Sequence, residues 1–409
     1  MPRVVVTGMG VVAPVGQTTR TFFAGLVAAR SGIRRLESAS FPGVQSLIAG
    51  QVDFDAPRHL PPHLTAQLDR AVQFALVVAK QALDEAALGL TDAELERAGV
   101  YWGTGLGGAT TTEESYKNLF AGDGRVRPSA VVTGMSNAAA GQISITHGLR
   151  GPLLNISTAC SSSASAIGEA YRVIQGGHAD VILAGGSEAL VTTGILRAWD
   201  AMRALARVDP DDPSRSCRPF SANRSGLVLG EGAGALILER ADRAERRGAH
   251  IYAEVVGYGN AADAFNMSKP DAGGQVRAMR LALDDAKLAP GKVDYVNAHG
   301  TATPVGDMVE TQALKQVFNS HGRRPLVSST KALHGHLMGG TGAVEMVASI
   351  MALEQGIVPP TAHLDTPDPL CDLDYVPNES RRASLEVVMS NSFGFGGMNA
   401  VLVARRYHD

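Results

Sequence analysis

The chain has 409 residues, of which 45% are hydrophobic and 19% are charged, so it supports a large buried core and excludes wholesale disorder. The 37 Lys and Arg residues nearly balance the 40 Asp and Glu residues, and the net charge of -3 lacks the basic excess of a nucleic-acid-binding protein. The sequence shows neither a run of the ~20 apolar residues that a membrane helix needs nor a signal-peptide pattern. We therefore expect a cytoplasmic protein that binds neither nucleic acid nor membranes.

Strand-like and helix-like segments alternate along the chain. Apolar residues recur at helical spacing from Leu68 to Ala86 and from Val276 to Ala286, and an apolar helix is expected from Val344 to Leu353. The expected strands are Val4–Val6, Val100–Trp102, Val181–Ala184, Leu227–Leu229, Ala235–Leu238, Val293–Val296, Val387–Met389 and Ala400–Val403. We place turns at Gly8 and Gly10 and between Gly230 and Gly234. The alternation predicts an α/β fold with mainly parallel central strands.

The length fits two or three domain-sized units, or one large duplicated core. No obvious sequence repeat relates the two parts of the chain, and no low-complexity linker divides them. A charged, helix-like stretch ends near Arg247. We therefore expect an N-terminal half at residues 1–250 and a C-terminal half at residues 251–409.

The chain has three cysteines, Cys160, Cys217 and Cys371, an odd and sparse set that argues against a disulfide framework and fits a reducing compartment. Cys160 stands where an apolar strand ends and a helix of small residues begins. Unpaired N–H groups and the helix dipole favour a thiolate there, and they can hold an oxyanion. The alternative is a buried, inert cysteine beside serines that cap the helix, and this segment taken alone favours that alternative.

Two further segments carry histidines. His299 follows the strand that ends at Val296, which is where α/β folds place ligands, and a neutral imidazole there can donate to developing negative charge. A structural histidine in a turn explains that segment equally well. In the second segment, Lys331 and His336 precede an apolar helix that carries Glu345, so the lysine could pair with this glutamate and orient a histidine. The alternative for that segment is a solvated loop. His334 and His336 lack a third ligand at matching local spacing, so we expect no metal site.

Two glycine-rich segments have different interpretations. Residues 390–399 are expected to form a strand, a loop with Phe393 and Phe395, and a second strand, in which glycines allow the backbone to approach a ligand. The alternative is a tight hairpin with core aromatic residues. Residues 103–108 resemble a dinucleotide-binding loop, but their glycine spacing does not match that fingerprint, and we reject nucleotide binding.

Together, these segments resemble an elongating type II β-ketoacyl-acyl-carrier-protein synthase of the thiolase superfamily. The resemblance covers essentially the whole chain, and its motifs occur in the order of the family. They are Thr158-Ala159-Cys160-Ser161, Ala298-His299-Gly300-Thr301, Lys331 with Gly335-His336, and Phe393-Gly394-Phe395-Gly396-Gly397. The resemblance implies a five-layered αβαβα fold built from two similar halves. It also implies a homodimer, or a heterodimer with a chain-length-factor-like subunit, and an acyl carrier protein as partner.

The resemblance also implies a reaction, a decarboxylative Claisen condensation of a Cys160-bound acyl chain with a malonyl thioester, without metal or organic cofactor. In this family pattern, His299 and His336 stabilise developing negative charge. The remaining roles fall on three groups of residues: Lys331, Glu345 and Phe395 in catalysis; Thr301, Thr303, Leu106, Trp199 and Phe393 in substrate binding; and Arg203 and Arg207 in carrier-protein docking.

The sequence departs from the usual elongating pattern at several positions. His334 and Met398 stand where threonine is common, Ser221 and Ser225 replace commonly acidic residues, and residues 66–67 lack the basic character found in fatty-acid enzymes. These changes favour a specialised pathway, such as a type II polyketide or polyene system. A non-catalytic chain-length partner would be expected to lack Cys160, and a degradative thiolase would be expected to carry a second catalytic cysteine near the C-terminus.

Overall fold

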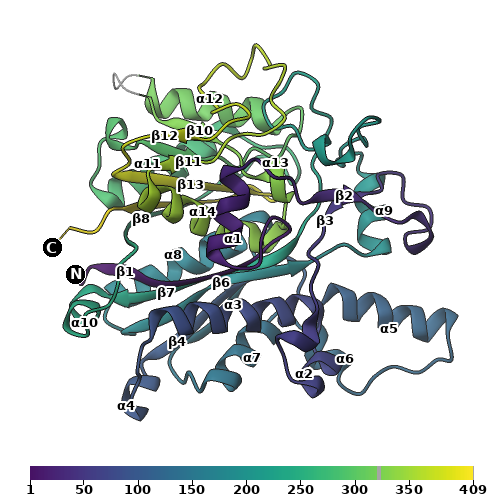
Figure 1. Ribbon diagram of the computed structural model, residues 1–409, viewed down its shortest axis with the longest axis horizontal. Coiled ribbons are helices and arrows are strands. Elements are labelled where there is room, and N and C mark those ends of the chain that lie inside the picture. The colour runs from purple at the N-terminus through teal and green to yellow at the C-terminus, as the bar shows by residue number, and fades with distance from the viewer. Residues whose placement is uncertain (320–323, 409) are drawn as a thin grey trace.

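The computed structural model describes residues 1–319 and 324–408, in which strands and helices alternate (Figure 1). The strands of the large sheet are β1 (Val4–Val12), β4 (Ala98–Gly103), β5 (Leu153–Ile156), β6 (Val181–Ala189), β7 (Glu231–Arg240), β8 (Ala253–Ala262), β9 (Tyr295–Asn297), β10 (Leu326–Ser328), β13 (Val387–Gly394) and β14 (Met398–Arg405). Two small sheets pair β2 (Ile33–Arg35) with β3 (Ile48–Gly50) and β11 (Ile357–Val358) with β12 (Arg381–Arg382).

The large sheet is mixed rather than mainly parallel. Its order is β10-β9-β13-β14-β8-β1-β7-β6-β4-β5. The outer pairs, β10–β9–β13 and β6–β4–β5, are parallel, whereas each pairing from β13 through β14, β8, β1 and β7 to β6 is antiparallel. The expectation of mainly parallel central strands is therefore wrong. Alternation of strands and helices predicts crossover connections between parallel strands. It does not reveal that the last strand of each half lies next to the first strand and antiparallel to it.

The strand order repeats on the two sides of the β8–β1 junction. Outward from the junction, the first half runs β1, β7, β6, β4 and β5, which are its first, fifth, fourth, second and third strands in the large sheet. The second half runs β8, β14, β13, β9 and β10, and this is the same order. The fold therefore consists of two similar halves, as the resemblance implied, although no sequence repeat indicates them.

Helices form three layers around the two halves of the sheet. The principal helices are α3 (Arg70–Ala86), α5 (Ala109–Ala121), α7 (Ala138–His147), α8 (Ser162–Gln175), α9 (Thr193–Ala201), α11 (Ala272–Ala286), α12 (Gly306–Phe318) and α14 (Thr341–Gln355). The shorter ones are α1 (Thr19–Val27), α2 (Pro62–Gln67), α4 (Asp92–Leu95), α6 (Ala130–Gly134), α10 (Ala241–Arg246) and α13 (Lys331–His334). Figure 1 shows α3 and α7 on one outer face, α8 and α14 between the half-sheets, and α11 and α12 on the other outer face. This is the expected αβαβα layering.

Glycines expected to make turns instead let helices pack closely on strands. Gly8 lies within β1, which continues to Val12, and a Cβ at Gly8 would lie 2.2 Å from the Ala82 carbonyl oxygen of α3. The equivalent strand of the second half has the same feature, because a Cβ at Gly257 would lie 2.2 Å from the Ala282 carbonyl oxygen of α11. Residues 8–10 lie within β1, and β7 begins at Glu231, so the expected turns at residues 8–10 and 230–234 are wrong. A glycine pattern does not distinguish a turn from a close helix–strand contact.

Helices α8 and α14 pack against each other in the central layer. All α14 residues from Thr341 to Leu353 are buried, which explains why this helix is mostly apolar rather than amphipathic. In the described part of the chain, no helix combines the length and hydrophobicity that a membrane crossing requires.

Candidate active site

Cys160 lies in a tight turn between β5 and α8. The residue before it, Ala159, adopts a left-handed conformation with φ of 52°, and a short 3-10 turn at Ala159–Ser161 leads into the helix. The cysteine is buried, with 5% of its surface exposed. Burial raises the pKa of its thiol to about 11, although a hydrogen bond from the Phe395 backbone N–H opposes this effect. The resting thiol is therefore protonated at neutral pH, and nucleophilic attack requires a base.

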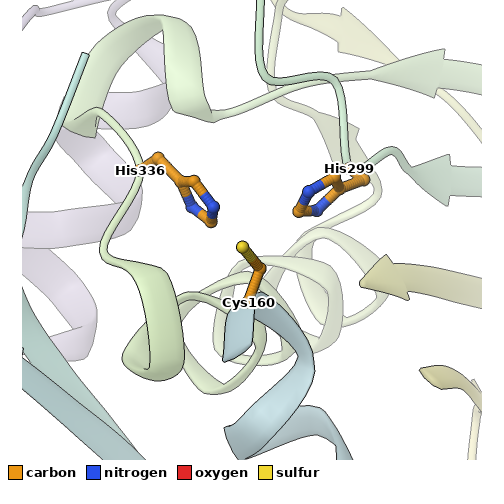
Figure 2. A group of neighbouring side chains, drawn as sticks. All are labelled: Cys160, His299 and His336. Carbon is orange, nitrogen blue, oxygen red and sulfur yellow. The ribbon is translucent and has the colours of Figure 1, made fainter. Parts of the chain in front are cut away.

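Two imidazole rings face the sulfur of Cys160. Figure 2 shows the His299 and His336 rings on either side of the sulfur atom. The ring centroids are 5.3 Å apart, the rings are nearly perpendicular, and one ring nitrogen of each lies within 4.8 Å of the other and of the sulfur. The structure therefore brings together three residues that lie far apart in the sequence, from the turn before α8, the segment after β9 and the loop after α13.

Both histidines are neutral at physiological pH. Burial lowers the pKa of His299 and His336 well below 6.5, and the positive charge of Lys331 lowers both further. The Nδ1 atom of His336 lies 2.9 Å from the Thr341 hydroxyl. Among the described residues, no hydrogen-bond partner exists for His299 Nδ1 or His336 Nε2. Each ring therefore keeps a buried nitrogen available for a substrate.

A fully buried ion pair lies behind the histidines. Lys331 Nζ is 2.5 Å from Glu345 Oε1, and neither side chain is exposed. Burial raises the pKa of Glu345 to about 7, and the Lys331 ammonium opposes this effect. Such a pair resists disruption, because removing one partner leaves a buried charge without compensation. The pairing of these two residues matches the expectation from the sequence.

Glu310 also belongs to the site, although the sequence analysis missed it. Its carboxylate accepts hydrogen bonds from the backbone N–H groups of His299 at 2.8 Å and Gly300 at 2.7 Å, and from Asn391 Nδ2 at 3.2 Å. These contacts fix the backbone that carries His299. Glu310 lies within α12, and no local motif marks it. The spacing of residues along a helix does not show whether an acidic side chain is buried or solvated.

The glycine-rich loop at residues 103–108 binds a carboxylate of the protein itself. Glu188 accepts hydrogen bonds from the N–H groups of Gly105 at 2.6 Å, Leu106 at 3.2 Å and Gly339 at 3.0 Å. Burial raises the pKa of Glu188 to about 7, and these hydrogen bonds act in the opposite direction. Two backbone donors of this loop are thus occupied by a side chain of the protein itself.

The loop between β13 and β14 meets Cys160 at close range. A Cβ at Gly394 would lie 2.8 Å from the Thr158 carbonyl oxygen and 3.3 Å from the Cys160 backbone nitrogen, so only glycine fits. This approach places the Phe395 N–H beside the Cys160 sulfur. The Phe395 ring stacks on Trp199 with ring centroids 5.6 Å apart. Phe395 therefore covers the apolar region beside the cysteine.

A cavity of about 390 Å³ opens onto this cluster. Nine of the residues to which the resemblance assigns a catalytic, substrate-binding or docking role line it: Cys160, Trp199, Arg203, His299, Thr301, Thr303, His336, Phe393 and Phe395. Lys331 and Glu345 lie buried behind this lining. Leu106 is 55% exposed and lies outside the described lining, as does Arg207, which is also exposed.

The positions that depart from the family pattern have different surroundings. His334 is buried, whereas Met398 is 43% exposed. The Ser225 hydroxyl lines the cavity and accepts a hydrogen bond from the Arg207 N–H at 3.0 Å. The Ser221 hydroxyl is buried and donates to the Thr366 carbonyl oxygen at 3.0 Å. Of these four, only Ser225 lines the described cavity.

Comparisons with known proteins agree on one family. The model of the N-terminal domain of beta-ketoacyl synthases matches residues 1–244, and that of the C-terminal domain matches residues 252–365. The chain is 41% identical to 3-oxoacyl-[acyl-carrier-protein] synthase 2 of Staphylococcus aureus (strain N315), over 99% of this chain and 98% of that protein.

Two solved structures cover 100% of this chain and are themselves covered completely. One is a type II PKS acyl-carrier protein in complex with its ketosynthase bound to the hexaketide, with a TM-score of 0.93 and 33% identity. The other is the ishigamide ketosynthase/chain length factor, with a TM-score of 0.90 and 34% identity. The fold is therefore that of the thiolase-like ketosynthases. The chain belongs to the β-ketoacyl synthase family.

Proposed function

We propose that this protein is a β-ketoacyl-acyl-carrier-protein synthase, an acyltransferase that extends a Cys160-bound acyl chain by decarboxylative condensation with a malonyl thioester. The observation that carries the proposal is the meeting of a buried thiol and two neutral imidazoles on one cavity. The 41% identical relative is named for this activity, and the match covers nearly the whole of both chains.

The first half-reaction loads Cys160. Its sulfur attacks the carbonyl carbon of an acyl thioester, and the proton of the thiol passes through an imidazole nitrogen to the departing carrier thiolate. The oxyanion that forms is held by the backbone N–H groups of Cys160 and Phe395, which the fit of Gly394 brings together. Loading keeps the acyl chain in place while its carrier leaves.

The second half-reaction forms the carbon–carbon bond. The malonyl thioester loses its carboxylate as carbon dioxide, and the two electrons of the broken bond form an enolate. Neutral His299 and His336 donate N–H groups to the enolate oxygen, and the depressed pKa that burial and Lys331 impose keeps both rings neutral. The enolate carbon then attacks the acyl carbonyl, and the Cys160 thiolate leaves and takes up a proton from solvent.

The surroundings of the cavity supply the substrate contacts of this proposal. Thr301 and Thr303, whose hydroxyls are 3.1 Å apart, would bind the pantetheine arm of an acyl carrier protein. Trp199 and Phe393 would enclose the acyl chain, and Leu106 would contact it from its exposed loop. Arg203 at the cavity mouth and Arg207 nearby would dock the acidic carrier. The chemistry needs no metal or organic cofactor.

We also propose that a second subunit covers the free edge of the sheet. The edge strand β5 exposes Leu153 and Leu154, and helix α5 exposes Tyr116, Leu119 and Phe120. Apolar side chains on an unpaired edge strand are typical of a subunit interface. A second copy or a chain-length-factor-like subunit fits this surface, and the ishigamide protein is a ketosynthase with a chain length factor. The buried free cysteines suit a cytoplasmic location.

The test is intact-protein mass spectrometry after incubation with a panel of acyl-carrier-protein thioesters. We expect the wild type to gain the mass of one acyl group and Cys160→Ala to gain none. Cys217→Ala is the matched control, because Cys217 is also buried but lies outside the described cavity lining, and it should load like the wild type. Loading of Cys160→Ala, or failure of the wild type to load with any thioester, would contradict the proposal.

A further inference from the structure

The position of Trp199 depends on one short helix. The buried side chains of α9 are Leu196 and Trp199, one turn apart on the same face. Both belong to the apolar cluster that contains Cys160. A shift of α9 therefore moves the wall that Trp199 presents to an acyl chain.

The N-terminus of α9 is held by a carboxylate from another helix. Its N-cap residue, Thr192, makes no side-chain cap. Instead, Glu113 of α5 accepts hydrogen bonds from the N–H groups of Thr193 at 3.1 Å and Gly194 at 2.7 Å. Two oxygens of one carboxylate thus satisfy the first two N–H groups of α9 and complement its dipole.

Neighbouring residues hold the Glu113 carboxylate in its position at the N-terminus of α9. A Cβ at residue 194 would lie 3.0 Å from Glu113 Oε2, so Gly194 permits the close approach. Lys117, one turn further along α5, lies 3.1 Å from Glu113 Oε1. Burial raises the pKa of Glu113, but the hydrogen bonds at α9 and the Lys117 ammonium outweigh it, and the pKa is lowered overall. The carboxylate is therefore ionised at neutral pH.

A second carboxylate holds the other end of α9. Asp200 accepts hydrogen bonds from the backbone N–H groups of Gln45 at 2.7 Å and Ser46 at 3.4 Å. The helix is thus fixed at its two ends by polar contacts, whereas its apolar face borders the cavity. By contrast, α5, all of whose residues the structure describes, contains no buried residue. The hydrogen bonds of Glu113 therefore connect the exposed helix α5 to α9, which forms part of the wall of the acyl site.

We propose that Glu113 is a positioning residue that sets the chain-length preference of the enzyme by holding α9, and with it Trp199, at a fixed depth in the acyl cavity. The inference rests on the proposed condensing function and names a determinant of its substrate range. Glu113 does not line the described cavity, so it acts through Trp199 and not on the acyl chain itself.

The first test measures rate constants for loading of Cys160 with a series of acyl-carrier-protein thioesters of increasing chain length. Loss of a helix cap costs about 1 kcal/mol, which corresponds to about a fivefold change. We expect Glu113→Ala to change the ratio of rate constants for longer over shorter chains about fivefold, and Glu113→Gln, which keeps one acceptor oxygen, to change it less. Glu114→Ala is the matched control on the same helix and should keep the wild-type ratio.

Double substitution distinguishes positioning from general damage. In a Trp199→Ala background, Glu113→Ala should leave the chain-length ratio unchanged, because the side chain that it positions is gone. An unchanged ratio in Glu113→Ala alone would overturn the inference. An equal change in both backgrounds would overturn it as well.

A second measurement does not depend on acylation. The chain has two tryptophans, and Trp102 is fully buried, so quenching of fluorescence by acrylamide reports mainly on Trp199. Glu113→Ala should increase quenching relative to wild type, and the increase should vanish in a Trp199→Phe background. Unaltered quenching would overturn the positioning role. Failure of the wild type to load any acyl group, with increased quenching in Glu113→Ala, would overturn the proposed function alone.

Discussion

Replacement of His334 by threonine should alter how the stability of the protein depends on pH. His334 is fully buried, and its Nδ1 lies 2.7 Å from the Gly335 carbonyl oxygen. Because a carbonyl only accepts, Nδ1 carries the proton and Nε2 accepts from the Thr330 hydroxyl at 2.9 Å. Burial and the nearby charge of Lys331 favour this neutral ring, although the hydrogen bond to the Gly335 carbonyl acts in the opposite direction. Burial and then Lys331 lower the pKa of His334 from 6.5 to about 3.

The sign and size of the effect follow from proton linkage. In the unfolded chain, His334 titrates near pH 6.5, so between pH 6.5 and pH 3 the unfolded state binds a proton that the folded state does not. The stability contributed by this residue is therefore present above pH 6.5 and is lost as the pH falls. From pH 7 to pH 5, the loss amounts to about 2 kcal/mol.

The comparison must be between variants, because other buried groups titrate in the same range. His299 and His336 act in the same direction as His334, whereas the raised pKa values of Glu188 and Glu345 act in the opposite direction. These contributions cancel when wild type and His334→Thr are measured under identical conditions.

The assay is urea unfolding of both proteins at pH 7 and pH 5. We expect the wild type to lose about 2 kcal/mol more than His334→Thr over this interval. His178→Thr replaces an exposed histidine and should behave like the wild type. Equal pH dependence of wild type and His334→Thr would refute the assignment of a neutral, buried ring.

Two predictions concern the reaction itself. Trp199→Ala should favour acyl chains two carbons longer by about 15-fold in kcat/KM, since each buried methylene contributes about 0.8 kcal/mol, and an unchanged profile in a chain-length panel would remove Trp199 from the wall. His336→Ala should slow malonyl decarboxylation by about 10²–10³-fold, the usual effect of removing one oxyanion donor, and slow acyl loading less. Assays of the two half-reactions check this, and equal losses would contradict the assigned role of His336.

Much of the candidate site could be predicted from the sequence, because its parts are short and chemically distinctive. A cysteine at a strand–helix junction, a histidine after a strand, a lysine before a glycine–histidine pair and a phenylalanine between glycines are local patterns. Their order along the chain indicated the family, and the structure places Cys160, His299, His336 and Phe395 around one cavity. Their catalytic roles remain predictions that the proposed experiments test.

The contacts that hold these residues in place could not be predicted in the same way. Glu310 supports the backbone of His299, Glu188 joins two loops, and Glu113 joins two helices. In the sequence, each is one acid among the 40 Asp and Glu residues. Whether an acid is buried and hydrogen-bonded depends on segments far away in the chain, so spacing alone does not distinguish it from a solvated side chain.

The α/β class, several of the principal helices and strands, and the residues of the catalytic motifs follow from the sequence, because periodicity and local chemistry are encoded over a few turns. Only the tertiary structure decided the mixed sheet and the duplication of the two halves. Strand direction and order arise from long-range backbone pairing, which is nearly independent of side-chain identity. The same strand order can therefore be built twice, with Gly8 and Gly257 in equivalent places, from halves that show no obvious sequence repeat.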